Sequence, residues 1–364
     1  MKKKLIVLGL LILGVGIFVT VLRSADWQDI VANLSQITFG KFLLFMAFAQ
    51  ISFAIFNLRW KILLKCHGHD IPFWTLWLYR AAGYGVSYIT PTQVGGEPVR
   101  IYLLHENHGI KLREATASVL LDKLIELSAF IAFVASGIFV VSFTNLIPKN
   151  SLHLFSALIV VFVGLSIYVF KKLLDGEGFL TTLFNGLRLN KVKKLQRFEK
   201  KIHRTENLIT KFLNHSQHKR STLPIIIGLS LLGWAFTIGE YYMLARFVGV
   251  GLGGYESFLI ATIPSVAYLL PMPAGLGMLE SAQVGLFSLL GYSAGSALAV
   301  MVMVRVKELF FSGVGFAYAL THGLTLLGKE STKKQFVKGP TGLKPRKITR
   351  IGIKKILQQT KASV

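Results

Sequence analysis

Ionisable side chains interrupt several of the longest apolar stretches of this sequence. They are Arg80, Arg100, Asp122, Lys123, Glu126, Glu240, Arg305, Lys307 and Glu308. A charge at the centre of a membrane helix costs at least about 2.5–3.5 kcal/mol, so such residues usually pair with one another or bind a ligand. Asp122 and Glu126 are one helical turn apart on one face, and Arg305 and Glu308 are helix neighbours. The sequence therefore predicts a polar interior in which these carboxylates face cations.

Two short segments rich in proline and glycine cannot continue a helix. Their helix-breaking residues are Pro91, Gly95, Gly96 and Pro98 in the first segment and Pro271, Pro273, Gly275 and Gly277 in the second. Irregular backbone at membrane depth is tolerated only inside protein or beside a water-filled cavity. Each break should leave free amide groups at the start of the next helix, where the helix dipole favours an anion. The alternative is a proline kink that serves packing alone.

In a bilayer the obvious anion is the phosphate of a lipid head group. We expect the phosphate to be bound by Arg100, Lys123 and Arg305 together with the glycines Gly95, Gly96, Gly275 and Gly277. We expect five carboxylates to orient these cations or to take up a coupling ion, and these are Glu97, Asp122, Glu126, Glu280 and Glu308. Helix breaks are expected at Pro91, Pro271 and Pro273. The alternative is that the charges only lock helices together.

Motifs for catalysis or for metal binding are not convincing. The histidines of His105-Glu106-Asn107-His108 are three residues apart rather than four, which argues against a zinc site. Cys66-His67-Gly68-His69 is too short for a closed metal site without distant partners. A P-loop is missing from the sequence. We therefore expect no catalytic residue, no metal and no cofactor.

The composition indicates a membrane protein, since 52% of the 364 residues are hydrophobic and only 16% are charged. A spanning helix needs about 20 mostly apolar residues. Candidate spans are 5–22, 40–62, 115–143, 152–170, 224–247 and 294–326, and two further apolar regions, 72–104 and 256–291, are interrupted by the breaks. The predicted fold class is all-α, a polytopic transmembrane helical bundle with about six full spans and two broken or re-entrant helical hairpins.

The two interrupted regions resemble one another. Tyr88-x-x-Pro91-x-x-x-Gly95 recurs as Tyr268-x-x-Pro271-x-x-x-Gly275, at an offset of 180 residues in all three positions. If the long basic segments face the cytosol, the two regions enter the membrane from opposite sides. Inverted repeats around broken helices are the architecture of many secondary transporters. The sequence thus predicts an inverted repeat, although three matching positions could also arise by chance.

Basic residues set the expected orientation. Lys and Arg number 41 against 17 Asp and Glu, and they concentrate in 171–221 and 328–364. Under the positive-inside rule these segments face the cytosol, which predicts a multi-pass protein of the cytoplasmic membrane with both termini cytosolic. We expect an integral membrane domain over 1–327, with 171–221 as a basic amphipathic loop, and a basic tail over 328–364. The N-terminal basic run and its 18-residue apolar stretch are interpreted as an uncleaved first span rather than a signal peptide.

Three motifs in order resemble one protein family. They are Pro91-x-x-x-Gly95-Gly96-Glu97-x-x-Arg100, then Ser118-Val119-Leu120-Leu121-Asp122-Lys123, then Pro271-x-Pro273-Ala274-Gly275-Leu276-Gly277-x-x-Glu280. Together they look like the transmembrane region of the lysyl-phosphatidylglycerol synthase family, whose stand-alone members are flippase-like membrane proteins. The resemblance extends from the first span to about residue 326. It implies a lipid-handling module with two re-entrant hairpins around a polar cavity for a phospholipid or polyprenyl-phosphate head group.

The chain departs from the family pattern in three respects. The family usually has Asp-Arg where this chain has Asp122-Lys123, which keeps the charge but loses a bidentate grip on phosphate. Ala274 stands where the family commonly has glycine. The bifunctional members carry a soluble aminoacyl-transferring domain after the membrane region, whereas this sequence has a basic tail there. Lysyl transfer is therefore not expected, and we do not expect an enzyme.

The leading hypothesis is a lipid translocase for an anionic phospholipid or a polyprenyl-phosphate-linked lipid. A second hypothesis is a membrane-embedded accessory subunit or enzyme of lipid-linked glycosyl or aminoacyl transfer, and a third is a scaffold that recruits partners to anionic lipid. Expected partners are anionic membrane lipids, with a glycosyltransferase or lipid-modifying enzyme as a candidate protein partner. Nucleic acid is not expected, because the basic residues of the tail are not interleaved with aromatic residues. The oligomeric state is left open.

Overall fold

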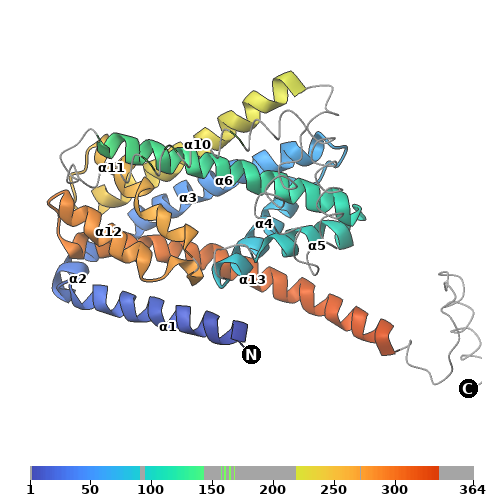
Figure 1. Ribbon diagram of the computed structural model, residues 1–364, viewed down its shortest axis with the longest axis horizontal. Coiled ribbons are helices and arrows are strands. Elements are labelled where there is room, and N and C mark those ends of the chain that lie inside the picture. Colours follow the sequence, from blue (N-terminus) through green and yellow to red (C-terminus); the bar gives the residue numbers. More distant parts are fainter. Residues whose placement is uncertain are drawn as a thin grey trace, which may run out of the picture. The chain divides into compact units, whose positions relative to one another are not determined.

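The computed structural model of the chain describes residues 2–90, 95–142, 219–270 and 272–335, with four single positions between 157 and 168. These described residues form α-helices and two 3₁₀ helices and contain no strand (Figure 1). The helices are α1 (Lys2–Arg23), α2 (Trp27–Ser35), α3 (Phe39–Lys65), α4 (Phe73–Tyr88), α5 (Glu97–His108), α6 (Leu112–Ser142), α10 (Lys219–Phe247), α11 (Gly254–Thr262), η3 (Pro264–Leu269), η4 (Pro273–Gly275), α12 (Met278–Leu289) and α13 (Ala294–Gln335). Residues Met1–Ala319 form one compact unit and Leu320–Val364 a second.

Membrane-spanning character is clear for three described helices. Phe39–Lys65, Leu112–Ser142 and Pro224–Phe247 are long and apolar enough to cross a membrane, and the bent pair formed by α1 and α2 raises the number to four if it counts as one span. The two parts of that pair meet at 84°, and α2 was not predicted from the sequence. The predicted span 152–170 lies almost wholly outside the described residues, as do the loop 171–221 up to Lys219 and the tail beyond Gln335.

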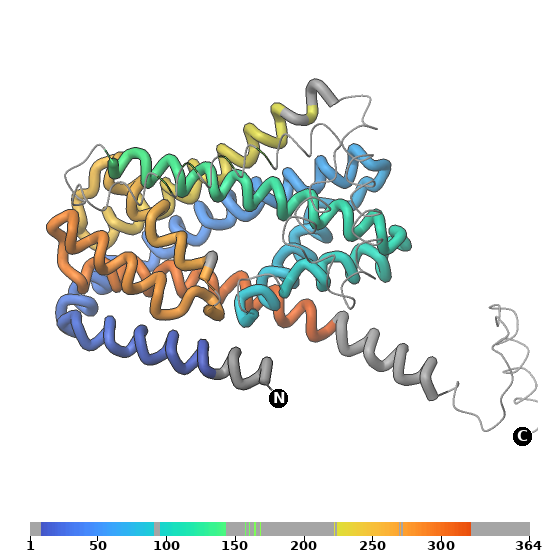
Figure 2. The backbone as a smooth tube through the Cα atoms, in the orientation of Figure 1, coloured from blue at the N-terminus to red at the C-terminus, as the bar shows by residue number. Residues whose placement is uncertain are grey.

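Both interrupted regions are broken helices. In the first, α4 ends at Tyr88 and α5 begins at Glu97. In the second, α11 gives way to η3, then to η4, and a new helix starts only at Met278, a path that Figure 2 follows in orange. The predicted breaks are therefore present, and each lies between two helices too short to span a bilayer on their own.

Helices α3 and α10 lie side by side and run in opposite directions (Figure 1). Near one end Lys41 lies over the ring of Phe247, 5.5 Å from its centroid, and near the other Cys66 Sγ lies 3.8 Å from Thr222 Oγ1. Gly233 leaves room for the ring of Phe56, so a small residue lets the two helices approach closely, as is usual in membranes. Each of these two helices precedes one of the broken hairpins.

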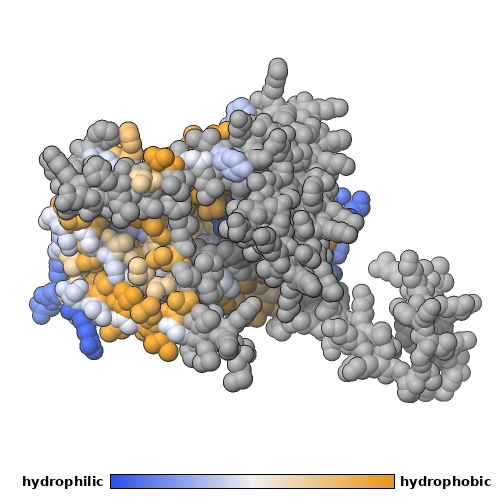
Figure 3. All heavy atoms as spheres, viewed as in Figure 1, coloured by the Kyte–Doolittle hydropathy of each residue, from blue (hydrophilic) through white to orange (hydrophobic). Residues whose placement is uncertain are grey.

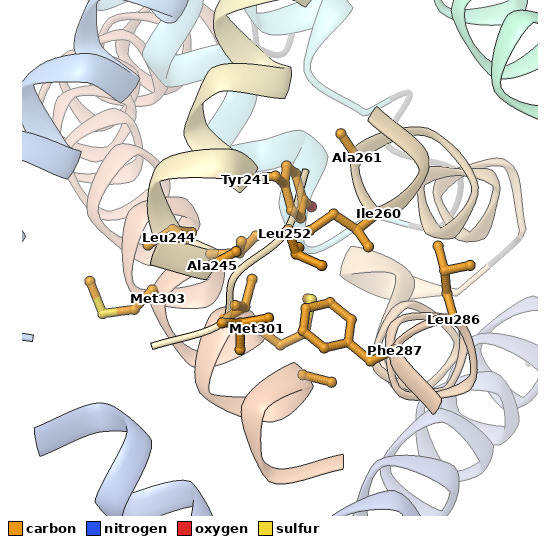
Figure 4. Packing of buried hydrophobic residues seen from close by; sticks show 14 of the residues in the cluster. Tyr241, Leu244, Ala245, Leu252, Ile260, Ala261, Leu286, Phe287, Met301 and Met303 are labelled. Atoms are coloured by element: carbon orange, nitrogen blue, oxygen red, sulfur yellow. The ribbon is translucent and has the colours of Figure 1, made fainter. Parts of the chain in front are cut away.

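Two apolar cores accompany the two hairpins. One gathers Trp60, Leu64, Leu76, Leu104 and Val119 from α3, α4, α5 and α6. The other is built mainly by α10 to α13, and Figure 4 shows its members Tyr241, Leu244, Ala245, Leu252, Ile260, Ala261, Leu286, Phe287, Met301 and Met303. Large apolar side chains such as Ile12, Leu44 and Phe39 remain exposed, and Figure 3 shows apolar residues over much of the coloured surface. That surface suits contact with lipid tails.

Glycines bring α13 and α1 close to the hairpins. A Cβ on Gly315 would overlap the carbonyl oxygen of Ala81, and one on Gly85 would lie 2.6 Å from the carbonyl oxygen of Ser312. The backbones of α4 and α13 are therefore in direct contact. In the same way, α1 crosses the second break where Gly14 faces Gly277.

Candidate functional site: two buried ionic clusters

Asp122 of α6 is the centre of a buried group of charges that joins four helices. Its Oδ1 accepts hydrogen bonds from Arg59 Nε at 3.1 Å and from Arg59 Nη2 at 2.8 Å. Its Oδ2 accepts from Arg80 Nη1 at 3.1 Å and from Arg100 Nη2 at 2.7 Å. Asp122 and Arg59 are both 0% exposed. Because one carboxylate holds three guanidinium groups, it ties α3, α4 and α5 to α6.

Glu126 lies one turn further along α6, and it extends the group of charges to a more exposed edge of the protein. Its Oε2 accepts from Arg80 Nη2 at 2.7 Å, and its Oε1 accepts from Lys123 Nζ at 3.0 Å. Lys123 Nζ also lies 3.5 Å from Glu97 Oε1. The side chains of Lys123 and Glu126 are 34% and 27% exposed, so a ligand would approach the group from this edge. We call Arg59, Arg80, Arg100, Lys123, Glu97, Asp122 and Glu126 the first cluster.

The first cluster has more positive than negative groups. Four cations, Arg59, Arg80, Arg100 and Lys123, face three carboxylates, Glu97, Asp122 and Glu126. Arg100 Nε and Glu97 Oε2 are buried and have no hydrogen-bond partner among the described residues. The Arg100 guanidinium lies 3.9 Å from the centroid of the Trp60 ring, a cation–π contact that fixes its plane. The surplus cation and the unused donor suit the binding of an anion.

The depth of Arg100 is set by the packing of α5 on α4. Gly96 lies so close to α4 that a Cβ there would overlap the carbonyl oxygen of Gly83 and the hydroxyl of Ser87. A Cβ on Gly83 would in turn lie 2.8 Å from Arg100 Cγ. The two glycines thus let the start of α5 lie directly on α4, and Arg100 reaches Asp122 from there.

The amides of the first break are not free. The Gly96 N–H donates to Ser87 Oγ at 3.0 Å, and the Gly95 N–H donates to Thr90 Oγ1 at 3.0 Å. The prediction of free amides is therefore wrong at these two glycines, because polar side chains at the end of α4 satisfy them. A phosphate could use them only by displacing the two hydroxyls.

The second break is closed in a similar way. The Gly277 N–H donates to Glu280 Oε2 at 2.8 Å, and the Gly275 N–H donates to the carbonyl oxygen of Met272 at 3.1 Å. The prediction of free amides is wrong here as well. Positive φ angles at Ala274, Gly275 and Gly277 make the sharp turns that aim α12. Pro273 starts η4, whereas Pro91 and Pro271 lie outside the described residues.

Ala274 adopts a backbone conformation that favours glycine, with φ of 53°. We expect Ala274→Gly to raise the free energy of unfolding by about 0.5–1 kcal/mol, because relief of about 1–2 kcal/mol of left-handed strain outweighs the added freedom of the unfolded chain. The apparent midpoint of thermal unfolding in detergent measures this. Gly251→Ala, where a Cβ would meet nothing within 4 Å, is the control for a general glycine effect. A lower midpoint for Ala274→Gly would contradict the strain.

Arg59 is the main residue of the first cluster that sequence reasoning missed. The sequence analysis did not single it out, yet it is 0% exposed and also donates from Nη1 to Ser230 Oγ of α10 at 3.1 Å. The signal was present, since Arg59 follows the buried Ser52 and Ile55 at spacings that place all three on one stripe of α3. Arg80, which the sequence analysis names among the charges of the apolar stretches, joins the two carboxylates Asp122 and Glu126.

A second cluster surrounds Arg305 of α13. Arg305 Nε donates to Glu280 Oε1 at 2.7 Å, and Arg305 Nη2 lies 2.6 Å from the same oxygen. Arg305 Nη1 donates to Glu308 Oε2 at 2.8 Å and to the carbonyl oxygen of Ala274 at 2.9 Å. Tyr268 of η3 donates its hydroxyl to Glu308 Oε1 at 2.6 Å. The helix neighbours Arg305 and Glu308 are thus paired, and together they hold the second break at three points.

Lys307 of α13 pairs with Glu240 of α10. We call Glu240, Glu280, Arg305, Lys307 and Glu308 the second cluster. It contains two cations and three carboxylates, so it has one negative group in excess where the first cluster has one positive group in excess. The two clusters also correspond in position, because Arg100 and Glu280 are 180 residues apart and each joins a broken helix to the following long helix. Among the described residues, no group of three or more His, Cys, Asp or Glu could hold a metal ion.

The fold and the two clusters define an integral, multi-pass helical membrane protein with a charged interior. The family model described as the lysylphosphatidylglycerol synthase TM region matches residues 6–315, and the chain belongs to this family. Two proteins of Methanothermobacter thermautotrophicus, each named UPF0104 membrane protein, are similar to it. One is 24% identical over 316 residues, covering 85% of this chain and 89% of the relative, and the other is 26% identical over 321 residues, covering 84% and 90%. A UPF0104 membrane protein of Archaeoglobus fulgidus is 25% identical over 249 residues, covering 66% of this chain and 75% of the relative.

Proposed function

We propose that the chain is a lipid translocase that moves an anionic phospholipid or a polyprenyl-phosphate-linked lipid across the cytoplasmic membrane. The observation that carries the proposal is the surplus of cations in the first cluster, buried beside a broken helix. An uncompensated charge inside a membrane protein is expensive, so it is kept where it binds something of opposite charge. A phosphate head group supplies that charge and can accept several hydrogen bonds from guanidinium groups.

Within this proposal the residues of the first cluster have different roles. Lys123 at the partly exposed edge meets the head group first, and Arg80 and Arg100 behind it bind the phosphate. Arg59, which is fully buried and has a hydrogen-bond partner for each of its three nitrogens, positions Asp122. The carboxylates share the cations until the lipid arrives, so the lipid replaces existing ion pairs rather than entering a site of bare charge.

The topology belongs to the proposal too. We propose six full spans and two re-entrant hairpins in an inverted repeat, with 171–221, 328–364 and both termini in the cytosol. Support comes from the opposite directions of α3 and α10 and from the offset of 180 residues between the breaks. The two halves would then open in turn to the two sides of the membrane. The family is named for the membrane region of a lipid-modifying enzyme, which agrees with a lipid substrate.

The test is a head-group accessibility assay in proteoliposomes with a fluorescent anionic phospholipid and a membrane-impermeant quencher. We expect Arg100→Gln to slow translocation by roughly 10-fold to 100-fold, because a charge-assisted hydrogen bond to phosphate contributes about 1.5–3 kcal/mol. Arg100→Lys should fall in between, since it keeps the charge and loses the planar fork.

The matched control is Lys111→Gln, which removes a cation whose side chain is 83% exposed, and its rate should stay near that of the wild type. A cooperative thermal unfolding transition in each variant shows that it is folded. Unchanged translocation in Arg100→Gln, Arg305→Ala and the double variant would remove the basis of the proposal. A different result would be that no lipid moves, but that a product forms when lipid and a glycosyl or aminoacyl donor are supplied. The chain would then be an enzyme or accessory subunit of lipid-linked glycosyl or aminoacyl transfer.

A further inference from the structure

Arg305 is shared by two buried carboxylates. Glu280 and Glu308 are 1% and 3% exposed, and both are within 2.8 Å of the Arg305 guanidinium. The remaining cation of the second cluster, Lys307, already has its own partner in Glu240. One guanidinium cannot neutralise two carboxylates, so this group of three carries one negative charge in excess. Because the excess is buried, uptake of one positive charge brings the group to neutrality.

We propose that the second cluster binds a proton at the carboxylate of Glu308. The space between the two carboxylates is filled by the guanidinium, which repels a metal cation, whereas a proton needs only one oxygen lone pair. Glu280 is the weaker candidate, because its Oε1 accepts from Arg305 Nε and lies 2.6 Å from Nη2, and its Oε2 accepts from the backbone Gly277 N–H. Glu308 instead accepts from side chains, with Arg305 Nη1 bonded to its Oε2 and the rotatable Tyr268 hydroxyl bonded to its Oε1.

The neighbours of Glu308 suit a change of protonation. Tyr268 donates its hydroxyl to the carboxylate and can accept from the acid, since a phenol does both. Gln283 follows Glu280 by three residues on α12, is 0% exposed, and has no hydrogen-bond partner for either side-chain polar atom among the described residues. This carboxamide is one helical turn from Glu280 and can accept or donate a hydrogen bond. The charged and titratable groups that act on this site are Arg305 and Lys307 of α13, Tyr268 of η3, Glu280 of α12, Glu240 and Tyr241 of α10, and Tyr84 and Tyr88 of α4.

One face of α4 connects this site to the first cluster. Arg80, Tyr84 and Tyr88 follow one another at four-residue spacing, so they lie along one side of the helix. Arg80 belongs to the first cluster, and Tyr88 interacts with both Arg305 and Glu308 of the second. The rings of Tyr84 and Tyr88 are in contact, 6.4 Å between centroids. Protonation of Glu308 therefore weakens its contact with Tyr88 of α4, and the same helix carries Arg80 of the first cluster.

Coupling of the proton to lipid movement rests on the proposed function, but the proton site does not. The test is infrared difference spectroscopy of purified protein in detergent between neutral and acidic pH. We expect a band of a buried protonated carboxylic acid in the wild type, separate from the bands of the solvent-exposed carboxyl groups. This band should disappear in Glu308→Gln and persist in Glu106→Gln, whose exposed carboxylate lies outside both clusters. Tyr268→Phe should keep the band, because the proton is bound by the Glu308 carboxylate and not by the phenol.

Two results would overturn the site. One is a band that survives Glu308→Gln in a folded protein, and the other is a band abolished by sodium ions at constant pH, which would assign the site to a metal cation. Translocation is measured separately. A proton band without lipid movement refutes the translocase and leaves the site standing, whereas lipid movement without the band refutes the site and leaves the translocase standing.

Discussion

Replacement of Asp122 by alanine should destabilise the protein more than any other single change to the clusters. The substitution leaves Arg59 fully buried without its main partner and removes one partner each from Arg80 and Arg100. Removing one member of a buried ion pair costs about 3–5 kcal/mol, because the remaining charge stays out of water. We therefore expect the midpoint of thermal unfolding in detergent to fall by roughly 6–12 °C. Asp122→Asn, which keeps the shape and loses the charge, should show most of this effect.

Asp70→Asn is the matched control for Asp122→Asn. The Asp70 side chain is 63% exposed and its oxygens lie 3.9 and 3.7 Å from the Lys61 and Lys65 ammonium groups. Exposed ion pairs of this kind contribute about 0–1 kcal/mol, so the midpoint should barely change. Equal midpoints for Asp122→Asn and Asp70→Asn would mean that Asp122 does not hold the arginines in the way described.

Two neighbouring glycines of α13 should respond to alanine with opposite signs. A Cβ on Gly315 would overlap the Ala81 carbonyl oxygen of α4, and neither backbone can give way without moving its helix. Overpacking of this kind costs about 1–3 kcal/mol, so Gly315→Ala should lower the unfolding midpoint. Gly313 has nothing within 4 Å of a Cβ, and Gly313→Ala should raise stability by about 0.5–1 kcal/mol through the higher helix propensity of alanine.

Chemical denaturation of both variants under identical detergent conditions measures the difference. The two variants have the same substitution in the same helix, so a difference in their stability reports the different surroundings of Gly313 and Gly315. A loss of the same size at Gly313 and Gly315 would show that glycine is needed for some general property of α13. That result would contradict the explanation that Gly315 is required by the close approach of the α4 and α13 backbones.

Several parts of the fold could be predicted because they follow from local chemistry. Long apolar stretches had to become helices, and the segments around Gly95 and Gly275 could not continue one. The ion pair between Arg305 and Glu308 follows from their spacing on one helix. The helix Trp27–Ser35 was missed, because nine residues of mixed polarity give a weak signal beside the long apolar stretches.

The site was harder to predict, since its partners come from distant parts of the chain. Nothing local indicates that Arg59 reaches Asp122 and Ser230, 63 and 171 residues away. The glycine amides were predicted to be free because a helix start leaves them without partners within the helix. Ser87, Thr90 and Glu280 satisfy those amides instead, and only the path of the chain through each break brings these side chains to them. Which cation meets which carboxylate is thus a property of the tertiary packing.

The most direct test of the account compares the wild-type protein with two lipids of identical tails and different head-group charge. Proteoliposomes would contain a trace of a fluorescent anionic phospholipid or of its zwitterionic counterpart, and the rate of head-group movement would be measured against protein-free vesicles. A surplus of buried cations predicts that the protein accelerates the anionic lipid at least about tenfold more than the zwitterionic one, a difference of about 1.4 kcal/mol. Equal acceleration of both lipids, or none of either, would contradict the assignment of the first cluster to an anionic head group.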